Sequence, residues 1–190
     1  MLQPGDRAPA PGQVVLVQDY VNTVDLEMNR DAFTRLSGLI AFCKAAAIPA
    51  SRISGRDLDR AIQLREALRD VCETHAGHPA PAASLRLLDA ALRDAPIILR
   101  LDASGQAGLV PATGLPGMEA LTAHLAIAIN AGTADGSWPR LKACSADTCR
   151  WVYYDGSPSG RSRWCTMSIC GSRAKVRAYR ERRTCTRTGR

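Results

Sequence analysis

Four cysteines near the C-terminal end constrain this chain more than any other feature. Cys144 and Cys149 are separated by four residues, as are Cys165 and Cys170, and fifteen residues lie between the two pairs. Two short cysteine loops joined by a hairpin can place four thiolates around one tetrahedral zinc ion. Residues 139–190 hold few aliphatic side chains and cannot fold unaided, whereas zinc ligation supplies about 10–16 kcal/mol in small fingers. Because four thiolates fill the coordination sphere, we expect one structural zinc ion.

The alternative is that these four cysteines are unrelated core thiols. A disulfide scaffold is disfavoured, because the seven cysteines are an odd number and the N-terminus does not resemble a secretory signal. Cys43 and Cys72 lie on apolar helical faces and are expected to be core residues, while Cys185 is assigned no role.

The residues around the cysteines predict the rest of the module. Residues 151–154 are strand-like, residues 155–160 are typical of a turn, and residues 161–164 are expected to return as the second strand of a hairpin. Gly171 lets the backbone approach the metal, and Ser172 is expected to cap the helix that follows. This order of elements predicts a small treble-clef-like zinc finger.

The net charge of the chain changes sign where this cysteine-containing module begins. Residues 1–138 hold 12 Lys and Arg against 15 Asp and Glu, whereas residues 139–190 hold 13 against 3. A concentrated positive field attracts polyanions. A surface that is charged only for solubility need not carry one sign, so we expect a nucleic-acid partner for residues 139–190.

The candidate nucleic-acid-binding residues are basic side chains of the second half of the module and of its terminal helix. Arg173, Arg177 and Arg180 fall on one helical face, and Val176 with Tyr179 form an apolar strip that is expected to dock on the module. The alternative is a solvated basic helix. The full set is Arg161, Arg163, Arg173, Lys175, Arg177, Arg180, Arg182 and Arg183.

Three aromatic residues of the module have two possible roles. Trp151, Tyr153 and Trp164 could stack on bases, but a small module needs a core, and the sequence favours that role.

The first 138 residues predict a mainly α-helical domain with one β-hairpin, which is an α+β fold. Helical patterns cover residues 31–48, 54–76, 81–93 and 118–131, and residues 96–111 predict the hairpin. Residues 14–17 fit either a strand or a buried helix, and the first dozen residues are expected to be a loose tail. Residues 133–139 are the expected domain boundary. No apolar run is long enough for a membrane span, so we expect a soluble cytoplasmic protein.

Possible functional residues of the first domain are few. Asn22, Thr23 and Asp25 could line a ligand pocket, although local hydrogen bonds that fix a turn are favoured. The three histidines, His75, His78 and His124, are assigned to helix ends and core, and no catalytic motif is found. We therefore expect no enzyme, although a buried pocket around His124 with a shifted pKa would support one.

The module resembles the CGNR-type zinc finger in the steps Trp164-Cys165-Thr166-Met167 and Cys170-Gly171-Ser172-Arg173-Ala174-Lys175. Ser172 replaces the asparagine of that signature. The preceding segment resembles, more loosely, the ABATE domain, with Val21-Asn22-Thr23-Val24-Asp25 as its marker. The resemblance implies a bacterial stress-responsive transcription regulator with an ABATE-like domain over residues 1–138 and the finger over residues 139–190.

Two functional hypotheses follow. The first is a DNA-binding transcription regulator, expected as a homodimer, whose first domain senses a small-molecule effector or mediates association. The second is an RNA- or protein-binding adaptor in which zinc only supports the fold.

Overall fold

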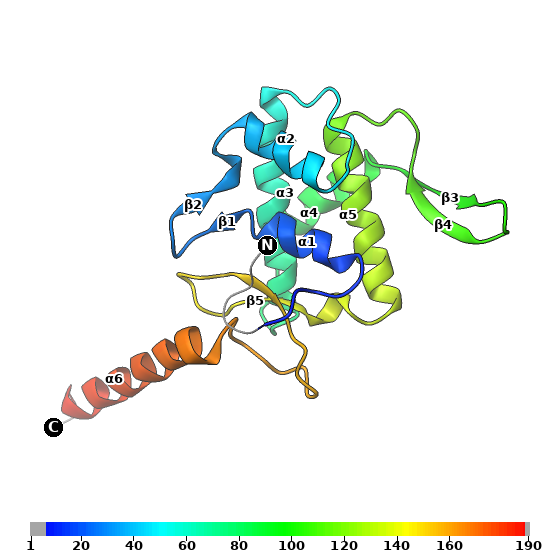
Figure 1. Ribbon diagram of the computed structural model, residues 1–190. Helices are drawn as coiled ribbons and strands as arrows, with labels where there is room; N and C mark the ends of the chain where they lie inside the picture. Colours follow the sequence, from blue (N-terminus) through cyan, green and yellow to red (C-terminus); the bar gives the residue numbers. More distant parts are fainter. Residues whose placement is uncertain (1–6, 189–190) are drawn as a thin grey trace.

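The computed structural model describes residues 7–188, apart from the side chains of Glu181 and residues 183–188. A helical body occupies most of the molecule, a small module lies against one end of it, and the last helix projects from the module into solvent (Figure 1). The helices are α1 (Val14–Val21), α2 (Leu36–Ala45), α3 (Gly55–Thr74), α4 (Ala82–Arg93), α5 (Gly117–Ala134) and α6 (Ser172–Thr188). The strands are β1 (Val24–Asp25), β2 (Arg30–Asp31), β3 (Ile97–Leu101), β4 (Ala107–Pro111), β5 (Leu141–Ala143) and β6 (Val152–Tyr154).

Helix α3 lies at the centre of the body and packs against α1, α2, α4 and α5. Its start is fixed as the sequence predicts, because the Asp57 carboxylate accepts the Ser54 N–H at 2.7 Å and completes a capping box. Tyr20, Phe33, Leu39 and Leu121 are among the fully buried side chains. The predicted helices and the β3–β4 hairpin are present, so the mixed α+β fold class is confirmed.

The structure decides one prediction that was left open and corrects another. Residues 14–17, which fitted a strand or a helix, begin α1. Gly132 was expected to end α5, but α5 continues to Ala134. Gly132 serves close packing instead, since a Cβ there would lie 2.2 Å from Cγ2 of Val14.

The predicted loose tail is wrong for residues 7–12, and residues 1–6 lie outside the described part of the chain. The Ala10 N–H donates to Oε1 of the buried Gln18 at 2.7 Å, and Ala10 itself is buried. Arg7 reaches the C-terminal module. Contacts this distant in sequence leave no local pattern, and a segment rich in Pro and Gly therefore looks unstructured.

The module shares its core with the body. Leu141, Ala143 and Val152, all from β5 and β6, are buried in the same cluster as the body helices. Strand β5 pairs antiparallel with β6, with Leu141 opposite Tyr154 and Ala143 opposite Val152.

The predicted pairing of residues 151–154 with residues 161–164 is therefore wrong. The backbone groups of β6 form their hydrogen bonds with β5 instead. The Arg163 carbonyl, in the segment expected to pair with β6, accepts the Ser145 N–H at 2.9 Å. The Asp155 carboxylate fixes the intervening turn by accepting the Ser162 N–H at 2.9 Å.

None of the helices in residues 7–188 combines the length and the apolar character needed to cross a bilayer.

Candidate metal centre and nucleic-acid interface

The four cysteines of the module converge on one point. Cys144 follows β5, Cys149 lies in the turn that leads to β6, and Cys170 lies in a π-helical turn over Met167–Gly171. All four thiols are buried, and their sulfur atoms lie within 4.8 Å of one another. The Sγ atom of Cys165 is 3.6 Å from that of Cys149 and 3.6 Å from that of Cys170.

These distances fit zinc. Four sulfurs at about 2.3 Å from a tetrahedral zinc ion lie about 3.8 Å apart, close to the separations found here. Thiolate sulfur is also the preferred donor of structural zinc sites. The four cysteines therefore form a zinc-finger site for one structural zinc ion, with no position left for a substrate.

The electrostatics of the cluster point to a cation as well. Hydrogen bonds from Cys149 and Cys165 lower the pKa of the Cys144 thiol to about 2. The bond to Cys144 raises the pKa of Cys149 to about 12, and the pKa values of Cys165 and Cys170 are also raised. Without a metal, a thiolate at Cys144 thus disfavours ionisation of the other three thiols. A divalent cation supplies the charge that lets all four thiols ionise.

The aromatic side chains of the module surround the thiols. Tyr153 is fully buried, and Trp151 and Trp164 are half-buried against the cysteine cluster. They form the core of the module, the role that the sequence favoured. Gly171 lies close to Met167, because a Cβ there would lie 2.4 Å from Sδ of Met167 and would displace that side chain.

Arg7 is a supporting residue that the sequence did not indicate. Its guanidinium lies 4.4 Å from the centre of the Tyr153 ring. It donates to the Trp164 carbonyl at 2.9 Å and to Oγ of Ser162 at 2.8 Å, and it also contacts the Cys165 carbonyl. The N-terminal segment thereby holds the second cysteine loop.

Asn22, predicted as a possible pocket residue, joins the body to the module. It is buried, its Nδ2 donates to the Val152 carbonyl at 2.7 Å, and its Oδ1 accepts the Val152 N–H at 2.9 Å. Thr23 donates to the Tyr20 carbonyl at 2.8 Å, and Asp25 accepts the Met28 N–H at 3.0 Å. The last two bonds are local, as favoured from the sequence.

Replacing Asn22 with alanine is expected to lower the free energy of unfolding by about 2 kcal/mol, because the Val152 N–H loses its buried partner and the Val152 carbonyl keeps only the longer bond from Gln18, at 3.3 Å. Asn130 is exposed on α5 and gives the matched control, since Asn130→Ala should change stability by less than about 0.5 kcal/mol. Urea unfolding followed by circular dichroism measures both. Equal stability of the two variants would contradict the role of Asn22.

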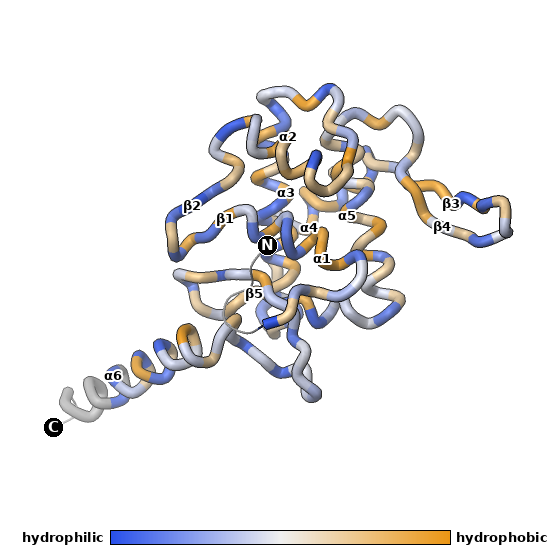
Figure 2. Tube along the Cα trace, in the orientation of Figure 1, coloured by the Kyte–Doolittle hydropathy of each residue, from blue (hydrophilic) through white to orange (hydrophobic). Residues whose placement is uncertain are grey.

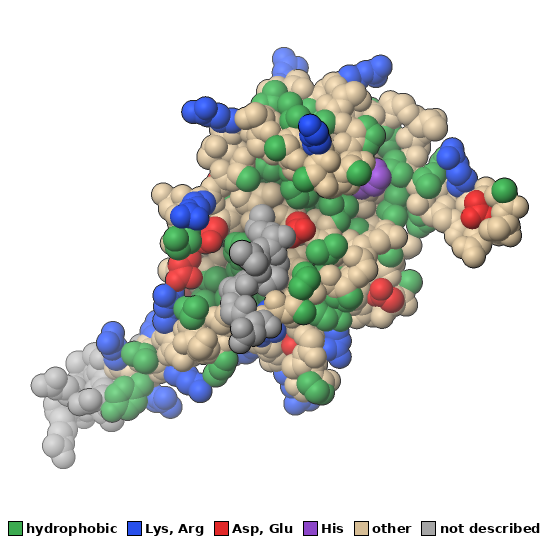
Figure 3. Space-filling model, in the orientation of Figure 1, with side chains coloured by type: hydrophobic (Ala, Val, Ile, Leu, Met, Phe, Trp, Pro, Cys, Tyr) green, Lys and Arg blue, Asp and Glu red, His purple; other side chains and the backbone are tan. Residues whose placement is uncertain are grey.

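Helix α6 carries most of the predicted nucleic-acid-binding residues. Arg161, Arg163, Lys175 and Arg177 are exposed. Figure 3 shows Lys and Arg side chains gathered around α6 and the module. Arg173, Arg180 and Arg182 are exposed too, and Arg173 forms an ion pair with Glu27. The side chain of Arg183 lies outside the described residues.

Two predictions about α6 are wrong. Val176 and Tyr179 do not dock on the module and are 50% and 56% exposed, because the π-helical turn directs α6 away from the zinc site. Ser172 is the first residue of α6 and not its cap, and its hydroxyl donates back to the Met167 carbonyl at 3.2 Å.

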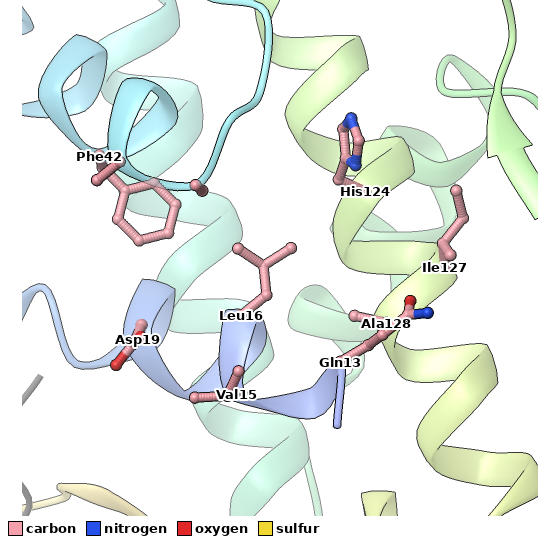
Figure 4. A pocket seen from close by; sticks show the side chains of 10 residues that line it. Gln13, Val15, Leu16, Asp19, Phe42, His124, Ile127 and Ala128 are labelled. Carbon is pink, nitrogen blue, oxygen red and sulfur yellow. The ribbon is translucent and has the colours of Figure 1, made fainter. Parts of the chain in front are cut away.

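His75 lies where the body meets the module, and His124 lies on a cavity of the body. Nδ1 of His75 is 2.8 Å from the Leu141 carbonyl, and burial lowers the pKa of this histidine. Burial also lowers the pKa of His124, which faces a cavity of about 530 Å³ (Figure 4). A pocket around His124 with a lowered pKa, the observation that would support an enzyme, is therefore present, and Asp19 is the other titratable side chain of its described wall.

Comparison with known proteins gives two family matches. Residues 140–183 match the CGNR zinc finger. Residues 15–135 match ABATE, described as "Putative stress-induced transcription regulator". Neither description is that of an enzyme. Comparison with curated proteins gave no match.

Proposed function

Because the chain belongs to the ABATE family and carries a CGNR zinc finger, we propose that it is a transcription regulator that binds duplex DNA through α6 and the adjoining module. The observation that carries the proposal is the projection of a basic helix away from the body (Figure 1). An α-helix fits the major groove, and the 17 residues of α6 span about 26 Å.

The charges of α6 support this role. Arg173, Arg177 and Arg180 recur at helical spacing on one face of α6, and all three are exposed. Arginine binds phosphate through two parallel N–H groups and can also read guanine edges. Arg161 and Arg163 extend the basic surface onto the module, where they can contact the flanking backbone.

A second function, an adaptor for RNA or protein, has one observation in its favour. Val176 and Tyr179 are exposed on α6 and could contact another macromolecule. The three aromatic residues of the module core are unsuitable as a stacking platform for single-stranded RNA, because they are buried or half-buried.

Competition between nucleic acids separates the two functions. A labelled duplex DNA of mixed sequence is bound to the full chain in 100 mM salt, and unlabelled duplex or single-stranded RNA of equal length is added. We expect duplex DNA to displace the label at a lower concentration than RNA does. Stronger displacement by RNA, or no binding of either, would argue for the adaptor.

Association between two copies is the second part of the proposal. Ile97, Leu99 and Leu101 of β3 share one face of the projecting hairpin, and they lie opposite Pro111, Leu109 and Ala107 of β4. The face is apolar throughout, and Leu99 and Leu101 are 67% and 66% exposed. Figure 2 shows hydrophobic residues along β3 of the projecting hairpin. An isolated two-stranded hairpin with such a face is unstable in water. A face without charges is complementary to itself, so a second copy can cover it in a twofold dimer.

Replacing both Leu99 and Leu101 with serine is expected to convert a dimer into a monomer. The change removes the two leucine side chains that each copy would bury against the other. Arg100 points to the opposite face of the hairpin, so Arg100→Ser is the matched control and should stay dimeric. Sedimentation velocity at micromolar concentration distinguishes the species. A wild-type chain that sediments as a monomer would refute this surface.

A further inference from the structure

A cavity of about 530 Å³ opens between α1, α2 and α5 (Figure 4). This volume is within the range of small-molecule sites. Most of its wall is apolar, and the aliphatic and aromatic side chains that face it are Val15, Leu16, Phe42, Ile127 and Ala128.

Three polar side chains complete the wall. They are Gln13 and Asp19 from the α1 segment and His124 from α5. The described residues that line the cavity include no lysine or arginine, so a carboxylate or phosphate group would enter without a compensating charge. Burial lowers the pKa of His124, and no hydrogen-bond partner of its ring is found in the described part of the chain.

We propose that this cavity is an effector site for a neutral, mainly apolar small molecule that carries one hydroxyl or amide group hydrogen-bonded to His124. The apolar wall supplies the affinity, and the unpartnered imidazole fixes the orientation. Because Asp19 lines the cavity and its described wall residues include no lysine or arginine, an anionic ligand is disfavoured. The role as effector rests on the proposed function, whereas the binding itself does not.

Helix α1 connects this site to the zinc module. Val15, Leu16 and Asp19 line the cavity, whereas Gln18 and Asn22 contact the carbonyl of Val152 on β6 at 3.3 and 2.7 Å. A ligand that moves α1 must therefore act on the strand that follows Cys149. Because α1 lines the cavity and also contacts β6, a ligand bound in the body can affect the DNA-binding module.

Two probes of equal size test the site. 2-Naphthol is neutral at pH 7 and carries a hydroxyl, whereas 2-naphthoate is anionic. Isothermal titration calorimetry of the full chain is expected to show at least tenfold tighter binding of 2-naphthol. His124→Leu keeps the volume of the wall and should weaken 2-naphthol about tenfold, the loss expected for one hydrogen bond.

A matched pair of tryptophan variants tests the location. Ala45 and Ala41 are both exposed on α2, but only Ala45 lines the cavity. Ala45→Trp should abolish binding, and Ala41→Trp should leave it unchanged. Equal affinity for both probes, or unchanged binding by Ala45→Trp, would overturn the proposal.

The experiment also distinguishes failure of the ligand site from failure of the proposed DNA-binding function. A chain that binds 2-naphthol but no DNA would overturn the proposed function and leave the site in place. A chain that binds DNA but not 2-naphthol would overturn the site alone. If both bind, 2-naphthol should change the affinity for duplex DNA in the wild type and not in Ala45→Trp.

Discussion

Removing zinc is expected to unfold the C-terminal module and to destabilise the helical body with it. Zinc ligation by four cysteines contributes about 10–16 kcal/mol in small fingers, which equals or exceeds the total stability of a typical domain. Leu141, Ala143 and Val152 belong to the core of the body, so an unfolded module exposes that core to water. The loss should therefore appear in α1 and α3 as well as in the module.

Two buried cysteines give a matched comparison. Cys165→Ala removes a zinc ligand, whereas Cys43→Ala removes a buried thiol of the body. We expect Cys165→Ala to lower the melting temperature by more than 15 °C, and Cys43→Ala to cost only about 1 kcal/mol, the effect of a small cavity. Thermal unfolding followed by circular dichroism, with and without a chelator, measures both.

Similar melting temperatures of the two variants would refute the structural role of zinc. A chelator that lowers the wild-type melting temperature but leaves Cys165→Ala unchanged would locate the effect at this site.

Replacing Arg173, Arg177 and Arg180 together with alanine is expected to weaken duplex DNA binding about 100- to 1000-fold in 100 mM salt. Each arginine that contacts a phosphate releases about one counterion from the DNA, and this contribution to affinity is lost when the arginine is replaced. The three arginines lie on one helical face and contact the DNA together. Stability should change by less than about 1 kcal/mol, because these side chains are exposed and the Arg173–Glu27 ion pair lies on the surface. Fluorescence anisotropy with a labelled duplex measures the affinity.

Net charge alone could produce a similar loss, and a second triple variant controls for it. Arg56, Arg86 and Arg93 are exposed on the body, and their replacement by alanine removes the same number of charges. We expect a loss of less than about fivefold, because these residues lie outside the proposed DNA-binding surface. Equal losses in the two triple variants would contradict a DNA-binding role for α6.

The sequence predicted those features whose cause is local. The spacing of Cys144, Cys149, Cys165 and Cys170 identified the metal site, since a tetrahedral metal constrains ligand type and number more than backbone path. The capping box at Ser54 and the helical periodicity after it likewise depend on neighbouring residues.

The sequence did not predict contacts between distant segments. Strand β6 could pair with residues on either side, and only the shared core with the body selects β5. Arg7 and Asn22 meet backbone groups more than a hundred residues away, and such bonds leave no periodic pattern. Val176 and Tyr179 formed an apolar strip that predicted docking, but the direction of α6 is set by the turn over Met167–Gly171.

The salt dependence of duplex DNA binding tests most directly whether zinc presents a basic helix to DNA. The logarithm of the association constant of the zinc-loaded chain for duplex DNA should fall linearly with the logarithm of salt concentration, with a slope of about −5 or steeper. The Arg173, Arg177 and Arg180 triple variant should have a slope smaller by about 3. A wild-type slope near zero, or a triple variant with the wild-type slope, would contradict DNA binding by this helix.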